Sequence, residues 1–304
     1  TISSRMLDTR IAGSFRDPAG HVFTRDGVVL RRVLPAGLDD YRALMDSGLY
    51  TALTGQLLLL PHEELGADTD DPGALVLRPL QVPTISYPYE WSLSQLRDAA
   101  LVTLKAQRAA LAAGMTMKDA SAFNVQFVDG RPMLIDTLSF ERYNGGPWIA
   151  YRQFCQHFYA PLCVAAAADA SLVRLQALYI DGLPLAIASQ LLPRSSWLRP
   201  GPLLHIHMHA KAEQKLTDRA PGGAPAGAAA QGESKQLPLI DSLERAIAAV
   251  SWTQRGHWAD YYADGESYSA EAFTEKTAIV TAWLDRVRPA TVWDLGANTG
   301  YYSK

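Results

Sequence analysis

Cysteine is scarce in this sequence, which has 304 residues and two cysteines, Cys155 and Cys163. Both fall in one apolar stretch, and their number and position do not suggest the disulfide framework of a small secreted domain. This scarcity favours a reducing compartment. We therefore expect the protein to be cytoplasmic.

Long hydrophobic runs are absent as well. A helix that spans a bilayer needs about 20 predominantly apolar residues, whereas the stretch that comes nearest, Phe158 to Ala168, is shorter and predicts a buried helix. The residues from Thr1 to Arg10 are polar and lack the apolar region of a signal peptide. The sequence therefore predicts neither a membrane span nor a membrane as partner.

Positive charge is not in excess. The formal net charge is -3 and the isoelectric point is about 6.2, which argues against a broad nucleic-acid surface and favours a small-molecule or protein substrate. Hydrophobic residues make up 48% of the chain and charged residues 19%, a composition typical of globular proteins. At this length about two domains are expected.

Local patterns divide the chain into a strand-rich beginning and a helix-rich middle. Alternating β-prone residues around the turn Asp26-Gly27 predict a hairpin within residues 13–33, and helix-like spacing follows over 39–49 and 53–60. A long amphipathic helix is predicted over Ser92 to Ala113, and Gly114 is placed to end it. Further helices are expected over 148–192, 242–250 and 270–288.

A group of polar residues after the long helix suggests phosphoryl chemistry. Asp119 and Asn124 are separated by four residues, and Asp136 follows Asn124 by twelve, after a hairpin that turns at Asp129-Gly130. Phosphoryl transfer needs a carboxylate near the acceptor hydroxyl and ligands that hold Mg²⁺ against the phosphates. The spacing predicts Asp119 as catalytic base, with Asn124 and Asp136 as metal ligands.

This segment resembles the catalytic region of kinase-like phosphotransferases, including the aminoglycoside and choline kinase group. The surrounding sequence agrees, because a strand-rich lobe precedes a connecting segment, Ser86 to Trp91, and helices follow it. The resemblance covers about residues 13–210. It implies an α+β kinase-like domain of two lobes, with Mg-ATP as cofactor.

Several positions differ from that kinase pattern. Met117 stands where those kinases usually carry His, and Thr137-Leu138 stands where Phe-Gly would follow the aspartate. No Gly-x-Gly-x-x-Gly loop precedes the site, and the strand-like run with Arg31 and Arg32 offers no lysine for the phosphates. Two alternatives therefore stand beside an active phosphotransferase. One is a non-catalytic, pseudokinase-like binding module, and the other is a structural role in which the two aspartates cap a turn and end a strand.

A second motif lies near the end of the sequence. Residues 292–300 read as an apolar strand that ends at Asp294, followed by a turn with Gly296 and Gly300. Gly296 lets a ligand approach the backbone, and Gly300 lets the following helix pack near the strand. The position two beyond Gly296 is Asn298, which weakens the dinucleotide fingerprint G-x-G-x-x-G. A turn that serves packing alone is the alternative.

The order D-x-G-x-x-x-G after an apolar strand resembles the first motif of class I methyltransferases that use S-adenosylmethionine (SAM). The resemblance covers residues 270–304 and implies the beginning of an α/β Rossmann-like domain. It places the cofactor on four residues, Asp294, Gly296, Asn298 and Gly300.

Both ends of the sequence look like cuts in a longer reading frame. The acidic residue that reads the adenosine ribose in the methyltransferase family would lie beyond Lys304. We therefore expect the 304-residue chain not to bind SAM measurably and to be inactive in methyl transfer. We also expect Val292, Trp293 and Leu295 to be exposed, because the neighbours of their strand would be missing.

Two smaller patterns carry alternatives. His205, His207 and His209 alternate, so on a strand they would share one face and could bind a metal; ordinary surface or core histidines are the alternative. The aromatic residues from Trp252 to Tyr268 could line a substrate entrance, with packing as the alternative.

Together the motifs resemble a group of bacterial class I SAM-dependent methyltransferases with a long N-terminal extension. We expect a kinase-like domain over 11–210, a linker over 211–240 and the start of a methyltransferase domain over 241–304. The linker is predicted to be flexible because its Ala-, Gly- and Pro-rich stretch, 220–232, buries little apolar surface. The intact protein would transfer a methyl group from SAM to an unidentified acceptor. Mg-ATP-dependent phosphoryl transfer by the N-terminal domain is the alternative function.

Overall fold

A computed structural model describes most of the chain, which divides into two compact units, Thr1–Ser251 and Trp252–Lys304. The described residues are 8–11, 13–14, 17–68, 71–212, 236–252, 269–297 and 300–303. Among them, no helix is both long enough and apolar enough to cross a membrane.

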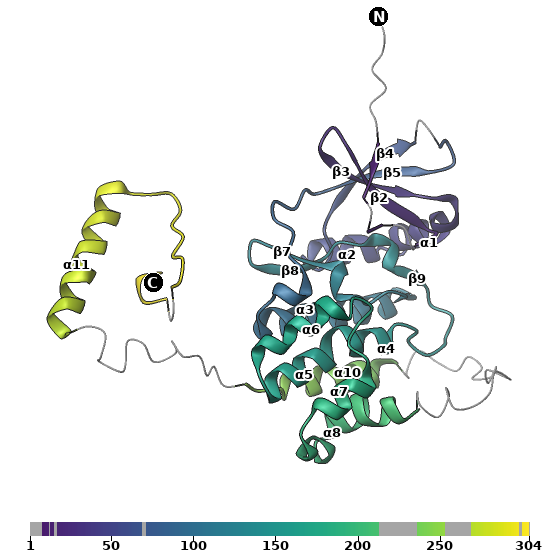
Figure 1. The fold of residues 1–304 in the computed structure, drawn as a ribbon. Helices are drawn as coiled ribbons and strands as arrows, with labels where there is room; N and C mark the ends of the chain where they lie inside the picture. Colours follow the sequence, from purple (N-terminus) through teal and green to yellow (C-terminus); the bar gives the residue numbers. More distant parts are fainter. Residues whose placement is uncertain are drawn as a thin grey trace, which may run out of the picture. The chain divides into compact units, whose positions relative to one another are not determined.

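The first unit begins with a five-stranded antiparallel sheet of order β1-β2-β3-β5-β4 (Figure 1). Its strands are β1 Thr9–Arg10, β2 Gly20–Arg25, β3 Val28–Val33, β4 His62–Ala67 and β5 Leu75–Pro79. The hairpin β2-β3 forms as expected, with φ of 52° at Asp26 and 77° at Gly27. Two left-handed residues in a two-residue turn match the right-handed twist of paired strands.

Helices α1 (Pro35–Asp46) and α2 (Leu49–Gly55) connect β3 to β4. The expected helix over 53–60 ends at Gly55, because the backbone of the next residues finds partners elsewhere. Leu60 donates to the carbonyl of Leu134 at 2.8 Å, and the amide of Leu134 donates to Leu58 at 2.8 Å. This short bridge ties the sheet region to the strands of the helical region.

The two faces of the sheet have different surroundings. On one face, α1 contributes Tyr41 to a core with Val33, Leu77 and Leu138. The other face holds a smaller cluster of Phe23, Leu30 and Val76. Since side chains alternate along β3, Arg31 points toward the first face and Arg32 toward the second.

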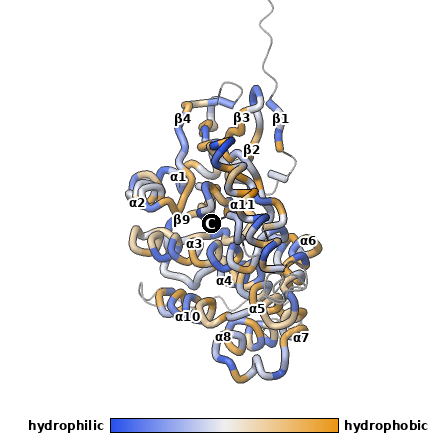
Figure 2. The backbone as a smooth tube through the Cα atoms, turned by 90° about the vertical axis from the view of Figure 1, so that its left-hand side faces the viewer, coloured by the Kyte–Doolittle hydropathy of each residue, from blue (hydrophilic) through white to orange (hydrophobic). Residues whose placement is uncertain are grey.

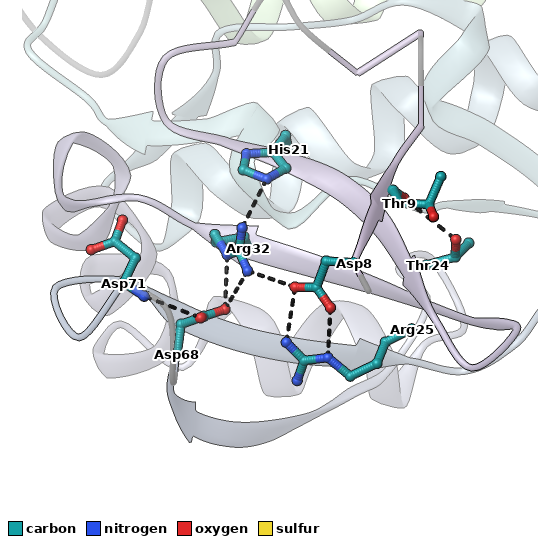
Figure 3. A network of polar contacts seen from close by, with 8 residues as sticks. All are labelled: Asp8, Thr9, His21, Thr24, Arg25, Arg32, Asp68 and Asp71. Carbon is teal, nitrogen blue, oxygen red and sulfur yellow. Dashed lines mark hydrogen bonds and ion pairs between the residues drawn. The ribbon is translucent and has the colours of Figure 1, made fainter. Parts of the chain in front are cut away.

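A polar network covers the second face and fixes β1 to the sheet (Figure 3). Arg32 donates to Asp8 and to Asp68 at 2.8 Å each, and its guanidinium lies 4.7 Å from the ring centre of Phe23. Arg25 binds the same Asp8 carboxylate at 2.8 and 2.9 Å. The Asp68 side chain is fully buried, and a buried carboxylate is costly unless a cation pairs with it. Arg32 supplies that cation for Asp68, and both arginines pair with Asp8.

The rest of the first unit is mainly helical and is built around α3 (Leu93–Ala112). Ser92 and Gln95 cap the start of α3 reciprocally, and Gly114, with φ of 70°, follows its end. Short strands pair beside α3: β6 Met115–Met117 with β9 Phe140–Arg142, and β7 Val125–Val128 with β8 Arg131–Leu134. The later helices are α4 Tyr151–Phe154, α5 Ala160–Ala167, α6 Leu175–Leu178, α7 Leu185–Leu191, α8 Pro200–Pro202 and α10 Gln236–Ala248. The α+β class expected for this part is confirmed.

Helix α10 belongs to the first unit, which differs from the domain boundaries expected from the sequence. The buried amide of Gln107 on α3 donates to Gln236 at 2.7 Å, and Arg108 forms ion pairs with Asp241 and Glu244. The apolar residues of α10 therefore complete the helical core, and the unit ends at Ser251 rather than before residue 241. Residues 213–235, which include the predicted flexible stretch, lie outside the described residues.

The second unit contains α11 (Ala270–Val287), at the place where a helix was expected. Residues 291–295 do not form the predicted strand in the described part of this unit, because a strand requires a partner for its backbone. Val292, Trp293 and Leu295 are exposed, as expected, and Leu295 is 88% accessible. The aromatic residues between 253 and 268 lie outside the described residues.

Candidate functional site

The predicted phosphoryl-transfer residues come from three loops that backbone hydrogen bonds hold together. Asp119 follows β6, Asn124 precedes β7, and Asp136 follows β8. The amide of Lys118 donates to the carbonyl of Ser139 at 2.8 Å, and the amide of Ile135 donates to the carbonyl of Asn124 at 2.9 Å. These two bonds place the start of the Asp119 loop and the Asn124 loop against the segment that carries Asp136.

Asp119 is held by donors on several sides. Its carboxylate accepts a hydrogen bond from the amide of Ser121 at 2.9 Å and another from the side chain of Gln153 at 2.8 Å, and it also interacts with the side chain of Asn124. Burial raises the pKa of Asp119, and the negative charge of Asp136 raises it as well, while the three donors oppose this shift. The carboxylate is thus oriented and easier to protonate than an ordinary aspartate.

Asn124 links the two acidic positions. Its amide donates to the hydroxyl of Ser139 at 3.2 Å, besides its interaction with Asp119. Ser139 lies three residues after Asp136. The Asn124 side chain therefore contacts both Asp119, the predicted base, and the segment that carries Asp136. The sequence spacing predicted Asp119, Asn124 and Asp136 as one group; in the structure Asp119 interacts with the side chain of Asn124, and the negative charge of Asp136 acts on Asp119.

Asp136 faces a cation of the sheet. The guanidinium of Arg31 on β3 forms an ion pair with its carboxylate, across 105 positions of sequence. The same carboxylate accepts the amide of Leu138 at 2.7 Å and so caps the short 3₁₀ turn that follows. The side chains of Arg31 and Asp136 are 16% and 13% exposed, so this pair is only partly screened by water.

Both aspartates also fulfil the structural alternative. Asp119 accepts the amide of Ser121, two residues on, and Asp136 accepts that of Leu138, also two residues on. Such turns are a frequent role of aspartate. Capping uses one oxygen lone pair of each carboxylate and leaves further acceptor positions, so it does not conflict with ligand binding.

Sequence reasoning missed the residues that support the group from a distance. Gln153 lies on α4, and Ser139 lies in the turn after Asp136; neither belongs to the kinase-like spacing. Arg31 was noted on its strand without a role, because no local pattern indicates a partner that far along the chain. Lys118, beside the predicted base, pairs with Asp40 on α1 at 3.7 Å.

The three alternating histidines do not form a metal site. Residues 203–208 form a π-helical turn rather than a strand, so His205 and His207 do not share a strand face. Hydroxyl groups form hydrogen bonds with the nitrogens of both rings: those of Tyr151 and Ser242 with His205, and those of Ser189 and Ser196 with His207. Within the described part of the chain, no group of three or more His, Cys, Asp or Glu side chains could hold a metal ion.

In the second unit, the glycine turn is partly described. Gly296 and Gly300 have φ of 79° and 72°, a left-handed conformation that favours glycine, and a Cβ atom at Gly296 would meet nothing within 4 Å. Asp294 accepts the hydroxyl of Ser303 at 2.8 Å. Asn298, the fourth predicted cofactor residue, lies outside the described residues.

Comparison with known proteins gives one sequence relative and several distant structures. No protein-family model matches the chain. The chain is 31% identical, over 308 aligned residues, to the nodulation protein NoeA of Rhizobium meliloti (strain 1021); the alignment covers 97% of this chain and 63% of NoeA, so the chain spans less than two thirds of that protein.

Among solved structures, two kinases resemble the chain weakly. The kinase PK-1 of the Cydia pomonella granulovirus has a TM-score of 0.35 at 9% identity, and the match covers 81% of this chain and 90% of PK-1. Vaccinia related kinase 3 has a TM-score of 0.35 at 12% identity, and covers 94% of this chain and 91% of its own. A similarity of this size does not by itself assign a fold.

Proposed function

We propose that the first unit is a kinase-like domain that transfers a phosphoryl group from a Mg²⁺-bound nucleotide to a small molecule. The observation that supports this proposal is that backbone hydrogen bonds hold the segments of Asp119, Asn124 and Asp136 together, while Asp119 interacts with Asn124 and with the charge of Asp136. Kinase chemistry uses such a base and such a pair of metal ligands, together with a cation on the third strand of the small lobe. Here β3 contributes Arg31, which lies against Asp136.

The side chains present fit Mg²⁺. Asn124 and Asp136 offer amide and carboxylate oxygens, the hard ligands that Mg²⁺ prefers, usually alongside waters and substrate phosphates. The carboxylate of Asp136 also suits a cation, because it already faces the guanidinium of Arg31. Bound Mg²⁺ would neutralise charge on the phosphates. Arg31 would then turn to the phosphates, the role of the lysine on the third strand of protein kinases.

Asp119 is the residue that we place at the acceptor. Its carboxylate would accept the proton of the acceptor hydroxyl as that oxygen bonds to phosphorus and the bond from phosphorus to the leaving oxygen of the nucleotide breaks. Gln153 orients the carboxylate at 2.8 Å. The raised pKa of Asp119 improves it as a proton acceptor, because a base works best when its pKa approaches the working pH.

The test is binding of ATP with and without Mg²⁺, followed as the shift in melting temperature. We expect a shift that requires both, is lost in Asp136→Asn and persists in Asp119→Asn, since the base is not needed for binding. Asp129→Asn is a matched control, because Asp129 lies in the hairpin turn with φ of 50°, which asparagine tolerates. The absence of any nucleotide shift, or an equal shift in Asp136→Asn, contradicts the proposal.

A non-catalytic binding module is the second candidate, and the Arg31–Asp136 ion pair favours it. A guanidinium at Asp136 can replace the metal and leave a domain that binds a ligand or a partner without transferring phosphate. In that case ATP without Mg²⁺ would shift the melting temperature as much as Mg-ATP does, or a partner alone would shift it.

Methyl transfer from SAM is the function that we propose for a longer protein containing the second unit. The left-handed glycines at 296 and 300 and the open space at Gly296 support it, since they let a ligand approach the backbone. Calorimetric titration with SAM tests it in a chain of the length of NoeA. We expect binding there that weakens on Gly296→Val; no binding by the longer chain contradicts the proposal.

A further inference from the structure

One end of the helical region carries exposed apolar and cationic side chains. We call residues 185–212 the basal tip; they include α7, a 3₁₀ turn at Arg194–Leu198 and a helical run over 200–212. The views in Figures 1 and 2 both place α7 and α8 at the end of the unit opposite the five-stranded sheet. The tip is therefore far from the Asp136 and Arg31 contact, which lies at the sheet.

Large apolar side chains of the tip face solvent. Leu198 is 87% exposed, and Met208 and Leu204 are 54% and 47% exposed. Leu204 and Met208 are four residues apart in one helical run, so they lie on the same face. Single exposed leucines are ordinary, whereas contiguous exposed apolar side chains are typical of contact surfaces.

The charge of the tip differs from that of the whole chain. Residues 182–212 contain no Asp or Glu, whereas they include Arg194, Arg199 and Lys211; the complete chain has a net charge of -3. Burial lowers the pKa of His205 and of His207, so both are neutral near pH 7 and the charged side chains of this segment are cations.

The tip is also well fixed. The Trp197 ring stacks on His207, with ring centres 4.1 Å apart, and Lys211 Nζ lies 4.5 Å from the centre of Trp197. His207 is in turn hydrogen-bonded by Ser189 and Ser196 at 2.7 and 2.8 Å. Leu198, which follows Trp197 directly, is therefore held outward by an ordered support rather than by a fraying end.

We propose that the basal tip binds the surface of a bilayer that contains anionic phospholipids. Segments that lie in a membrane interface combine leucine and tryptophan with lysine and arginine, and an anionic leaflet attracts nearby cations. This contact needs no membrane-spanning segment, but it departs from the expectation from sequence that a membrane is not a partner. It does not depend on the proposed phosphoryl transfer.

The test is co-sedimentation of the complete chain with vesicles of phosphatidylcholine alone or with about a third of phosphatidylglycerol, at low and high salt. We expect binding to the anionic vesicles that weakens with salt. Arg194→Ala should weaken it about fivefold, and Leu198→Ser about tenfold. Matched controls outside the tip are Ile149→Ser, at a residue that is 69% exposed, and Arg142→Ala, at an exposed residue; both should bind like the unchanged chain.

Three results would overturn the proposal. The first is no binding to anionic vesicles at low salt. The second is binding that Leu198→Ser leaves unchanged while an acidic polypeptide competes fully, which would show a purely ionic surface suited to an acidic protein. The third is equal weakening by Ile149→Ser and Leu198→Ser. Melting temperatures of the variants show that each one is folded.

Discussion

Arg31 and Arg32 are neighbours on β3 with different partners, which makes them a matched pair for testing the cation site. Arg31 meets Asp136, whereas Arg32 binds Asp8 and Asp68 on the other face of the sheet. Their side chains are similarly buried, at 16% and 14% exposure. Replacement of each by methionine removes the charge and keeps most of the apolar length.

The two changes should cost comparable stability. Loss of one partner from a fully buried ion pair costs about 3–5 kcal/mol, and loss from an exposed pair costs up to about 1 kcal/mol. For the partly exposed Arg31–Asp136 pair we expect about 2 kcal/mol on Arg31→Met. Arg32→Met should cost at least as much, because the Asp68 side chain is fully buried.

The response to Mg²⁺ should separate the two variants. Without Arg31, the carboxylate of Asp136 keeps its bond from Leu138 but lacks a cation, so Mg²⁺ should bind there without competition. At ten times its dissociation constant, such an ion adds about 1.4 kcal/mol to the free energy of unfolding. No such gain is expected for Arg32→Met, because Asp8 keeps its pair with Arg25 and the Asp68 side chain has no exposed area.

Urea unfolding at constant ionic strength, with and without Mg²⁺, measures this difference. We expect a larger gain with Mg²⁺ for Arg31→Met than for Arg32→Met or the unchanged chain. Equal gains in both variants, or no gain in Arg31→Met, would refute the view that Arg31 occupies a divalent-cation position.

Three other positions allow independent checks of the fold. Burial lowers the pKa of His205 to about 4, so the folded state favours the neutral ring. The resulting contribution to the free energy of unfolding is complete above pH ~6.5 and should fall by about 3 kcal/mol toward pH 4. His205→Gln should flatten this part of the pH profile of urea unfolding, and an unchanged profile contradicts the burial. Gln107→Leu leaves the backbone N–H of Met117 without its acceptor and the side-chain oxygen of Gln236 without its donor, and it should cost about 2–3 kcal/mol in urea unfolding. A loss below ~0.5 kcal/mol would mean that α10 does not depend on this contact. Gly201→Ala would place a Cβ atom against the hydroxyl of Tyr159, closer than van der Waals contact allows, and should cost about 1–3 kcal/mol; an unchanged melting temperature would show that α8 packs less closely.

The elements that could be predicted from sequence are those whose signal is local. The hairpins at Asp26-Gly27 and Asp129-Gly130 depend on four residues with positive φ, and α3 carries its own cap at Ser92. β4 could not be predicted, because it is an exposed edge strand with a polar sequence and no alternation of buried residues. The extended course of Leu58 to Leu60 likewise depends on backbone partners far along the chain.

The site shows the same division between local and distant signals. The spacing from Asp119 to Asp136 predicts the group because its residues lie within one stretch of the chain. The contribution of Arg31 could not be predicted, since it depends on how the sheet packs above Asp136. The strand expected near Asp294 required neighbouring strands that the described residues of the second unit do not include.

Binding of Mn²⁺ in the presence of ADP, followed by electron paramagnetic resonance, tests the central claim most directly. Mn²⁺ takes the same oxygen ligands as Mg²⁺, and the signal of the free ion reports how much is bound. We predict one nucleotide-dependent Mn²⁺ per chain, lost in Asp136→Asn and weakened in Asn124→Leu, and unchanged in Asp129→Asn. Binding that needs no nucleotide, or that survives in Asp136→Asn, would contradict a kinase-like site at Asp119, Asn124 and Asp136.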